Sequence, residues 1–323
     1  MTIYDAIKSF NEQFAWEPEI VNGKSQRTYS KFVVCGMGGS NLAAGLLKIY
    51  KPELQVITHR DYSLPALPEN VLKEILIIAS SYSGNTEEAI DAFETAGKKN
   101  LTRAAISIGG KLLEMAKKEG VPYIQMPDTG IEPRSALGFS FKGLLKIIGE
   151  EDAVKEVSEL ARILKPAECE NEGKALAKRL KGFIPIIYSS SRNEGIAYNW
   201  KIKFNETGKI PAFCNVFPEL NHNEMNSFAA EKEMKYLSEK FYFIFLKDAT
   251  DHPRIQKRME VMKKLFNEKK LTVETLEIKG ENALHKIFSS LILADWTAYY
   301  LALAYGVEPN EVPMVEEFKK LIA

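Results

Sequence analysis

Residues 74–90 read "EILIIASSYSGNTEEAI", a short apolar run, then a loop rich in serine and glycine, then a segment with helical spacing. An unbroken apolar run of this length is typical of a strand that is buried on both faces of a sheet. The apolar residues after Glu87 recur at the intervals of one helix face. A strand that leads through a small-residue loop into a helix predicts an α/β fold with a parallel sheet.

The same strand-to-helix alternation continues along the chain. We predict strands over 31–37, 54–60, 74–80, 102–108 and 122–127, and then over 183–189, 211–217, 241–247 and 271–278. Helical spacing is found over 42–49, 87–96, 112–119, 134–148 and about 283–305. The 323-residue length favours two domains, 1–150 and 151–323, the second opening with the charged helical segment 151–181.

The two halves resemble each other. "VVCGMGGSNLAAGLL" (33–47) and "IIYSSSRNEGIAYNW" (186–200) both run from a strand through small residues into a helix, which indicates an internal duplication. The hydroxyl-rich loop is not duplicated, because "DATDHPR" (248–254) follows the corresponding strand of the second half. A loop that binds an anion is therefore predicted in the first half only.

Composition narrows the class of protein. Lys plus Arg and Asp plus Glu both number 43, so no basic excess suggests a nucleic acid or membrane partner. No apolar stretch approaches the roughly 20 residues that span a bilayer. Three separated cysteines without a CxxC pair favour reduced thiols and a cytoplasmic protein.

Two loops could bind an anion. Ser81, Ser83 and Thr86 lie where a helix begins, and free backbone N–H groups and the helix dipole favour an anion there. The alternative is a plain helix cap, which needs one such residue. "GMGGSN" (36–41) invites a dinucleotide site, but the GxGxxG pattern requires glycine where Asn41 stands. A glycine-rich turn that lets helix and strand approach closely is the alternative for this loop.

Taken together, "GMGGSN" and "SSYSGNTEEAI" resemble the sugar isomerase (SIS) domain. "EPRSALGFSF" (132–141), "NEGIAYNWKIKFNETGKIPAFCNVFPELNHNE" (193–224) and "VEPNEVPMVEEFKKLI" (307–322) resemble the bifunctional phosphoglucose/phosphomannose isomerases over almost the whole chain. The resemblance implies two similar SIS-type, flavodoxin-like domains, each a parallel sheet flanked by helices. It also implies that Gly39, Ser40, Ser81, Ser83 and Thr86 bind the substrate phosphate.

The resemblance also implies the catalytic residues. Glu206 is assigned as the base, although a lone helical glutamate is usually a solvated surface residue. His222 is assigned to ring opening, in the active site of the partner subunit of a homodimer. Arg134 would stabilise the enediolate with its permanent charge. Lys319 would assist ring opening, and its neighbour Lys320 is the alternative.

The function so implied is an aldose-ketose isomerase that interconverts glucose 6-phosphate, and mannose 6-phosphate, with fructose 6-phosphate through an enediol. No two histidines have the spacing of metal ligands, so we expect a reaction without metal or cofactor. A catalytic serine is disfavoured because no GxSxG elbow is present. The alternative function is a non-catalytic SIS protein that binds a sugar phosphate as a regulator.

Overall fold

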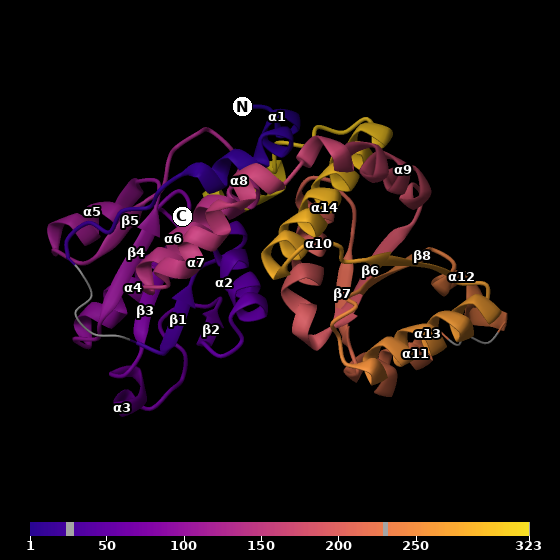
Figure 1. The fold of residues 1–323 in the computed structure, drawn as a ribbon, viewed down its shortest axis with the longest axis horizontal. Helices are drawn as coiled ribbons and strands as arrows, with labels where there is room; N and C mark the ends of the chain where they lie inside the picture. Colours follow the sequence, from indigo (N-terminus) through magenta and orange to yellow (C-terminus); the bar gives the residue numbers. More distant parts are fainter. Residues whose placement is uncertain (24–28, 229–231, 323) are drawn as a thin grey trace. The chain divides into compact units, whose positions relative to one another are not determined.

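The computed structural model describes residues 1–23, 29–228 and 232–322, and the chain divides into two α/β units (Figure 1). The first unit consists of Met1 and Lys8–Lys165, and the second of Thr2–Ile7 and Pro166–Ala323. Each unit is built around its own parallel sheet, as the alternation of strands and helices predicts.

The sheet of the first unit has the strand order β2-β1-β3-β4-β5, with every neighbouring pair parallel. Its strands are β1 (Lys31–Cys35), β2 (Gln55–His59), β3 (Leu76–Ser80), β4 (Arg103–Ser107) and β5 (Tyr123–Gln125). Its longer helices are α2 (Gly39–Tyr50), α4 (Glu87–Lys98), α5 (Gly110–Lys118) and α6 (Leu137–Ile147). This order is that of flavodoxin, and it reverses direction between β1 and β3.

The sheet of the second unit has the order β7-β6-β8-β9, which is the same order without a fifth strand among the described residues. Its strands are β6 (Ile184–Ser190), β7 (Phe213–Phe217), β8 (Phe241–Lys247) and β9 (Thr272–Glu277), all paired in parallel. Its longer helices are α9 (Glu170–Leu180), α10 (Glu194–Glu206), α13 (Pro253–Glu268), α14 (Ala283–Tyr305) and α15 (Pro313–Ile322).

Short helices complete both units. The first contains η1 (Phe10–Ala15), α3 (Glu69–Leu72), η2 (Pro133–Ser135), α7 (Glu151–Ser158) and α8 (Leu160–Ile163). The second contains most of α1 (Ile3–Lys8), together with η3 (Pro166–Cys169), η4 (Ser191–Asn193), η5 (Glu219–His222), α11 (Glu224–Ser227), η6 (Lys232–Met234) and α12 (Lys235–Ser238).

The predicted fold class is confirmed, and each of the nine predicted strands is present within three residues of its predicted bounds. The division between the units differs from the predicted boundary at 150. Helices α7 and α8 pack on α6 and η1, so residues 151–165 belong to the first unit. Pro166 then starts the second unit.

Two terminal segments contribute to the second unit in ways that local patterns do not reveal. The ring of Tyr4, in α1, packs edge-on against Trp296 at 5.2 Å. Helix α14 is long and apolar enough to cross a membrane by length and composition, contrary to the expectation that no stretch would be. Two thirds of its most apolar 18-residue stretch is buried, and the helix packs on α9 and α10. The core helix of a globular domain has the same character.

Candidate active site

The loops that follow β1 and β3 form the predicted anion-binding region of the first unit. Ligands of open parallel sheets bind at the carboxyl edge, in the crevice where the strand order reverses. In this sheet the reversal lies between β1 and β3. "GMGGSN" and "SSYSGNT" are therefore brought together at the position where the fold favours a ligand.

Ser81 organises the loop from the inside. Its side chain is fully buried, and its hydroxyl accepts hydrogen bonds from the N–H groups of Gly84 at 3.0 Å and Thr86 at 3.3 Å. The same hydroxyl lies 2.7 Å from that of Thr86. Since a hydroxyl has one proton and accepts about two hydrogen bonds, Ser81 donates its proton to Thr86. The Thr86 proton is then free to point away from Ser81.

Ser83 and Thr86 are the accessible hydroxyls of this loop. Ser83 is exposed and Thr86 half-buried, directly before the first turn of α4. The N–H groups of that turn have no acceptor within the helix. Gly84 has a φ of +76°, and a Cβ there would lie 1.8 Å from the backbone oxygen of Gly109. The loop can therefore close only with glycine at position 84.

Ser40 ties the two loops together. Its hydroxyl accepts a hydrogen bond from the N–H of Tyr82 at 2.8 Å, and its backbone oxygen accepts one from the Ser80 hydroxyl at 3.0 Å. Ser40 is 7% exposed and keeps its own proton to donate. These contacts fix the distance between the loops.

Arg134 lies against the first of these loops. A Cβ on Gly39 would come within 2.6 Å of the Pro133 carbonyl carbon and 2.8 Å of the Arg134 nitrogen, so the backbones touch where Gly39 has no side chain. Arg134 is 2% exposed, and one of its guanidinium nitrogens lies 3.5 Å from the carboxylate of Glu132. The structure thus brings Arg134 and Gly39 together, as the predicted site requires.

The buried Gln13 holds the turn that carries Arg134, which the sequence did not indicate. Its amide donates to the backbone oxygen of Ser135 at 2.7 Å and accepts from the N–H of Gly138 at 2.9 Å. A glutamine about 120 residues away in the sequence gives no local signal of this contact. Gln13 is a positioning residue for the arginine.

Glu206 is the last residue of α10, in the second unit, and is half-buried. The buried ion pair between Lys203 and Asp295, 2.6 Å long, fastens this end of α10 to α14. Asn205 donates to the backbone oxygens of Ile210 at 3.0 Å and Ala212 at 3.5 Å, just before β7 begins. Glu206 therefore lies at the amino edge of the second sheet, where β7 starts.

Lys209 links the end of α10 to the segment before the last helix. Its ammonium group donates to the backbone oxygen of Glu206 at 2.5 Å and to that of Glu311. Glu311 precedes α15, which carries Lys319. Lys319 is exposed and paired with Glu316 at 2.7 Å, and Lys320 is exposed as well. The structure brings the start of α15 to Glu206, and both lysines remain candidates.

His222 lies at the opposite edge of the second sheet. It ends η5, directly after β7, and is exposed. The hydroxyl of Ser191, which follows β6, donates to the backbone oxygen of Phe217 at the end of β7 at 2.8 Å, so this is the carboxyl edge. Helix α10 begins near that edge and ends at Glu206, about 18 Å further along its axis. Glu206 and His222 of one second unit are thus far apart.

No predicted site residue lines a hollow beside β9 in the second unit. This hollow, of about 550 Å³, runs beside β9 and is lined by Lys263, Thr275 and Ser290, among others. Within residues 1–23, 29–228 and 232–322, no three His, Cys, Asp or Glu side chains gather in a way that could hold a metal ion.

Two solved structures with the same fold are, by name, enzymes that act on sugar phosphates. Glucosamine-6-phosphate deaminase from Thermotoga maritima aligns with a TM-score of 0.63 at 16% identity, over 96% of each chain. Tagatose-6-phosphate ketose/aldose isomerase from Escherichia coli aligns with a TM-score of 0.60 at 16% identity, over 95% of this chain and 88% of its own. Residues 169–322 match the bacterial phospho-glucose isomerase C-terminal SIS domain. The fold and its loops define a protein of the SIS class.

Sequence relatives narrow the class to one family. A bifunctional phosphoglucose/phosphomannose isomerase from Caldicellulosiruptor bescii is 36% identical over 99% of both chains. One from Aquifex aeolicus is 32% identical over 98% of this chain and 97% of its own. The chain belongs to the family of bifunctional phosphoglucose/phosphomannose isomerases. A D-glucosamine-6-phosphate 4-epimerase from Sulfolobus acidocaldarius is more distant, at 28% identity over 65% of this chain.

Proposed function

We propose that the protein interconverts glucose 6-phosphate and mannose 6-phosphate with fructose 6-phosphate, through a C1–C2 enediol and without a metal ion. The observation that carries the proposal is the hydroxyl loop Ser81–Thr86 at the strand-order reversal of the first sheet, in a chain that matches its family from end to end. A regulator that only binds sugar phosphate would need this loop but not the arginine and glutamate motifs.

The phosphate is bound by Ser83, Thr86 and the N–H groups at the start of α4. Ser81 turns the Thr86 proton toward the ligand, and Ser40 with Gly39 shapes the facing loop. Phosphate is unchanged in the reaction, so these contacts act equally in the ground state and the transition state.

Glu206 moves a proton between C1 and C2 as general base and then acid. Arg134 stabilises the negative charge that develops on the enediolate oxygen. Glucose and mannose 6-phosphate differ only at C2, so both give the same enediol. An active site that reprotonates either face of C2 would accept both sugars.

His222 serves ring opening in the active site of a partner subunit of a homodimer. The support for this assignment is topological, because His222 and Glu206 lie at opposite edges of one sheet. Lys319, or Lys320 beside it, assists the same step from α15, whose start Lys209 ties to Glu206.

The test is a substrate panel. Purified protein in EDTA is incubated with glucose 6-phosphate, mannose 6-phosphate and glucosamine 6-phosphate, and fructose 6-phosphate is measured. Formation from the first two sugars is expected. If the folded protein binds sugar phosphate but forms no product from any of the three sugars, the regulator is favoured. Conversion of glucosamine 6-phosphate alone would redirect the proposal to an amino sugar.

A further inference from the structure

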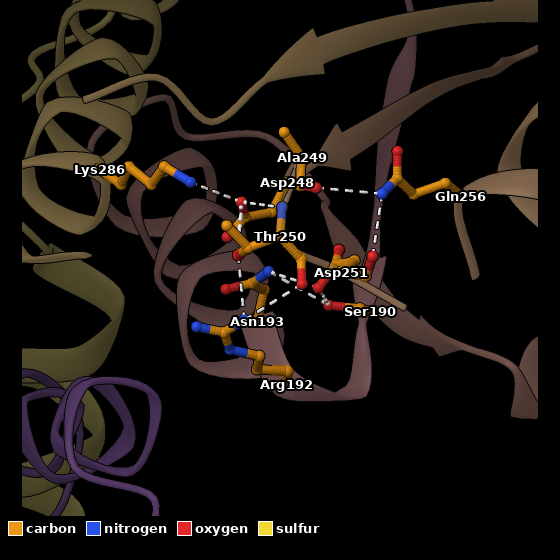
Figure 2. A network of polar contacts seen from close by, with 9 residues as sticks. All are labelled: Ser190, Arg192, Asn193, Asp248, Ala249, Thr250, Asp251, Gln256 and Lys286. Carbon is orange, nitrogen blue, oxygen red and sulfur yellow. Dashed lines mark hydrogen bonds and ion pairs between the residues drawn. The ribbon is translucent and has the colours of Figure 1, made fainter. Parts of the chain in front are cut away.

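At the strand-order reversal of the second sheet, the position where open parallel sheets have their ligand crevice, lies a polar network with two carboxylates at its centre (Figure 2). Strands β6 and β8 hold the places that β1 and β3 hold in the first sheet. The loops Ser190–Asn193 and Asp248–Asp251 therefore correspond to the "GMGGSN" and "SSYSGNT" loops.

The two carboxylates accept hydrogen bonds from several donors of this crevice. One oxygen of Asp251 accepts from the Ser190 hydroxyl at 2.7 Å and the Asn193 amide at 3.2 Å. One oxygen of Asp248 accepts from the N–H of Thr250 at 2.9 Å, its hydroxyl at 2.9 Å and the ammonium group of Lys286 at 2.8 Å. Hydroxyls, amides and an ammonium group are the donors with which proteins bind phosphate.

A second observation concerns the other oxygen of Asp251. Asp251 is 5% exposed, and this oxygen has no hydrogen-bond partner among the residues that the structure describes. Burial, reinforced by the charge of Asp248, raises the pKa of Asp251. A buried acceptor left unpaired costs stability, so an acid at this position requires a reason other than the folding of the loop.

The first unit has no such acids. Neither residues 36–41 nor residues 80–86 contain Asp or Glu. Donors at its crevice, such as Ser83 and Thr86, remain available to an anion from outside. If the two units arose by duplication, both began with the same crevice. The presence of Asp248 and Asp251 now distinguishes the crevice of the second unit from that of the first.

We propose that the side chains of Asp248 and Asp251 occupy the second crevice and exclude phosphate from it, so that each chain binds sugar phosphate in its first unit alone. The carboxylate of Asp248 repels a phosphate dianion, and both side chains accept the donors and fill the space that the phosphate would need. The two acids of the second unit thereby limit each chain to one phosphate-binding site. The inference depends on the proposed function only for the identity of the ligand in the first unit.

The experiment removes both carboxylates. Asp248→Ala/Asp251→Ala opens the space and frees the donors, while Asp152→Ala/Glu159→Ala removes two exposed acids as the matched control for net charge. Inorganic phosphate is titrated into each folded protein by calorimetry, and the melting temperature is followed against phosphate concentration. The Asp248/Asp251 variant is expected to bind about one more phosphate per chain than the parent and to be stabilised more by it.

Two results would overturn the proposal: two phosphates bound per parent chain, or no additional phosphate bound by a folded Asp248/Asp251 variant. If that variant does not fold, Asp251→Ala leaves the Asp248–Lys286 ion pair in place. Phosphate should then raise its melting temperature more than that of the parent, and an equal rise contradicts the proposal. A parent that binds no phosphate would contradict the site in the first unit, while a gain in the variant would still support this inference.

Discussion

Glu206 and His222 lie at opposite edges of the second sheet, one where β7 begins and the other just after it ends. A proton shuttle and a ring-opening group must both reach one sugar, whose C1 and ring oxygen are bonded neighbours. The two residues of a single second unit cannot meet this requirement without a large rearrangement. A homodimer in which each site takes His222 from the other chain removes the difficulty.

Subunit mixing tests this arrangement. Glu206→Gln and His222→Gln are each expected to be weakly active alone. Their equimolar, reassociated mixture is expected to recover about a quarter of parental activity, since half of the dimers are mixed and each mixed dimer carries one intact site out of two. The control is the same mixture without dissociation and reassociation. If both residues acted within one chain, mixing would restore nothing.

Changes in the hydroxyl loop should weaken binding more than turnover. Ser83→Ala/Thr86→Val is expected to raise KM for both sugar phosphates and the inhibition constant of inorganic phosphate by more than about tenfold, because each hydrogen bond to a charged group contributes roughly 1.5 to 3 kcal/mol. Steady-state kinetics measure both constants. Unchanged constants in a folded variant would show that the loop is only a helix cap.

Ser81→Ala tests whether Ser81 acts by positioning Thr86 rather than by contacting the phosphate. The hydroxyl of Ser81 is buried and bonded within the loop, so its loss should disorder Thr86 and also lower stability by about 1 kcal/mol or more. The expected result is a higher KM together with a lower melting temperature. Ser83→Ala, at an exposed position, is the control and should raise KM with little effect on melting.

Gly39→Ala should damage the site through Arg134. The added Cβ would lie 2.6 Å from the carbonyl carbon of Pro133, so the turn that carries the arginine must move. We expect kcat to fall with little change in overall fold by circular dichroism. Gly143→Ala, in helix α6, is the control, because its added Cβ would lie 3.5 Å or more from its neighbours and its φ is not positive.

The stability of Asp251→Asn should differ from that of the parent in a pH-dependent way. Burial and Asp248 raise the pKa of Asp251, while Ser190 and Arg192 act against this shift. A raised pKa means that the folded state loses stability as pH increases through the range between the unfolded and the folded pKa. The variant, which has no proton to lose, should therefore gain stability relative to the parent as pH rises above about 4, the ordinary pKa of aspartate. Urea unfolding over a series of pH values measures this, and a pH-independent difference would contradict it.

The nine strands could be predicted because a run of apolar residues and a change of period are local features. The unit to which α7 and α8 belong could not be predicted, since an amphipathic segment can pack on either unit. In the structure α7 packs on α6, which places both helices in the first unit. Within the site, Ser81, Ser83 and Thr86 look equivalent in sequence. Only the folded loop shows that Ser81 is buried and the other two are accessible. Gln13 had no local signal at all.

The most direct test of the central claim compares the parent with Glu206→Gln on glucose 6-phosphate and mannose 6-phosphate in the presence of EDTA. The rate of fructose 6-phosphate formation is measured for each protein. Binding of inorganic phosphate is measured as well, as a check that the site in the first unit is intact. The account predicts that the parent converts both sugars, and that the variant binds phosphate normally but turns over at least about a hundredfold more slowly. A folded Glu206→Gln variant whose kcat stays within about tenfold of the parent would contradict the assignment of Glu206 as the proton shuttle.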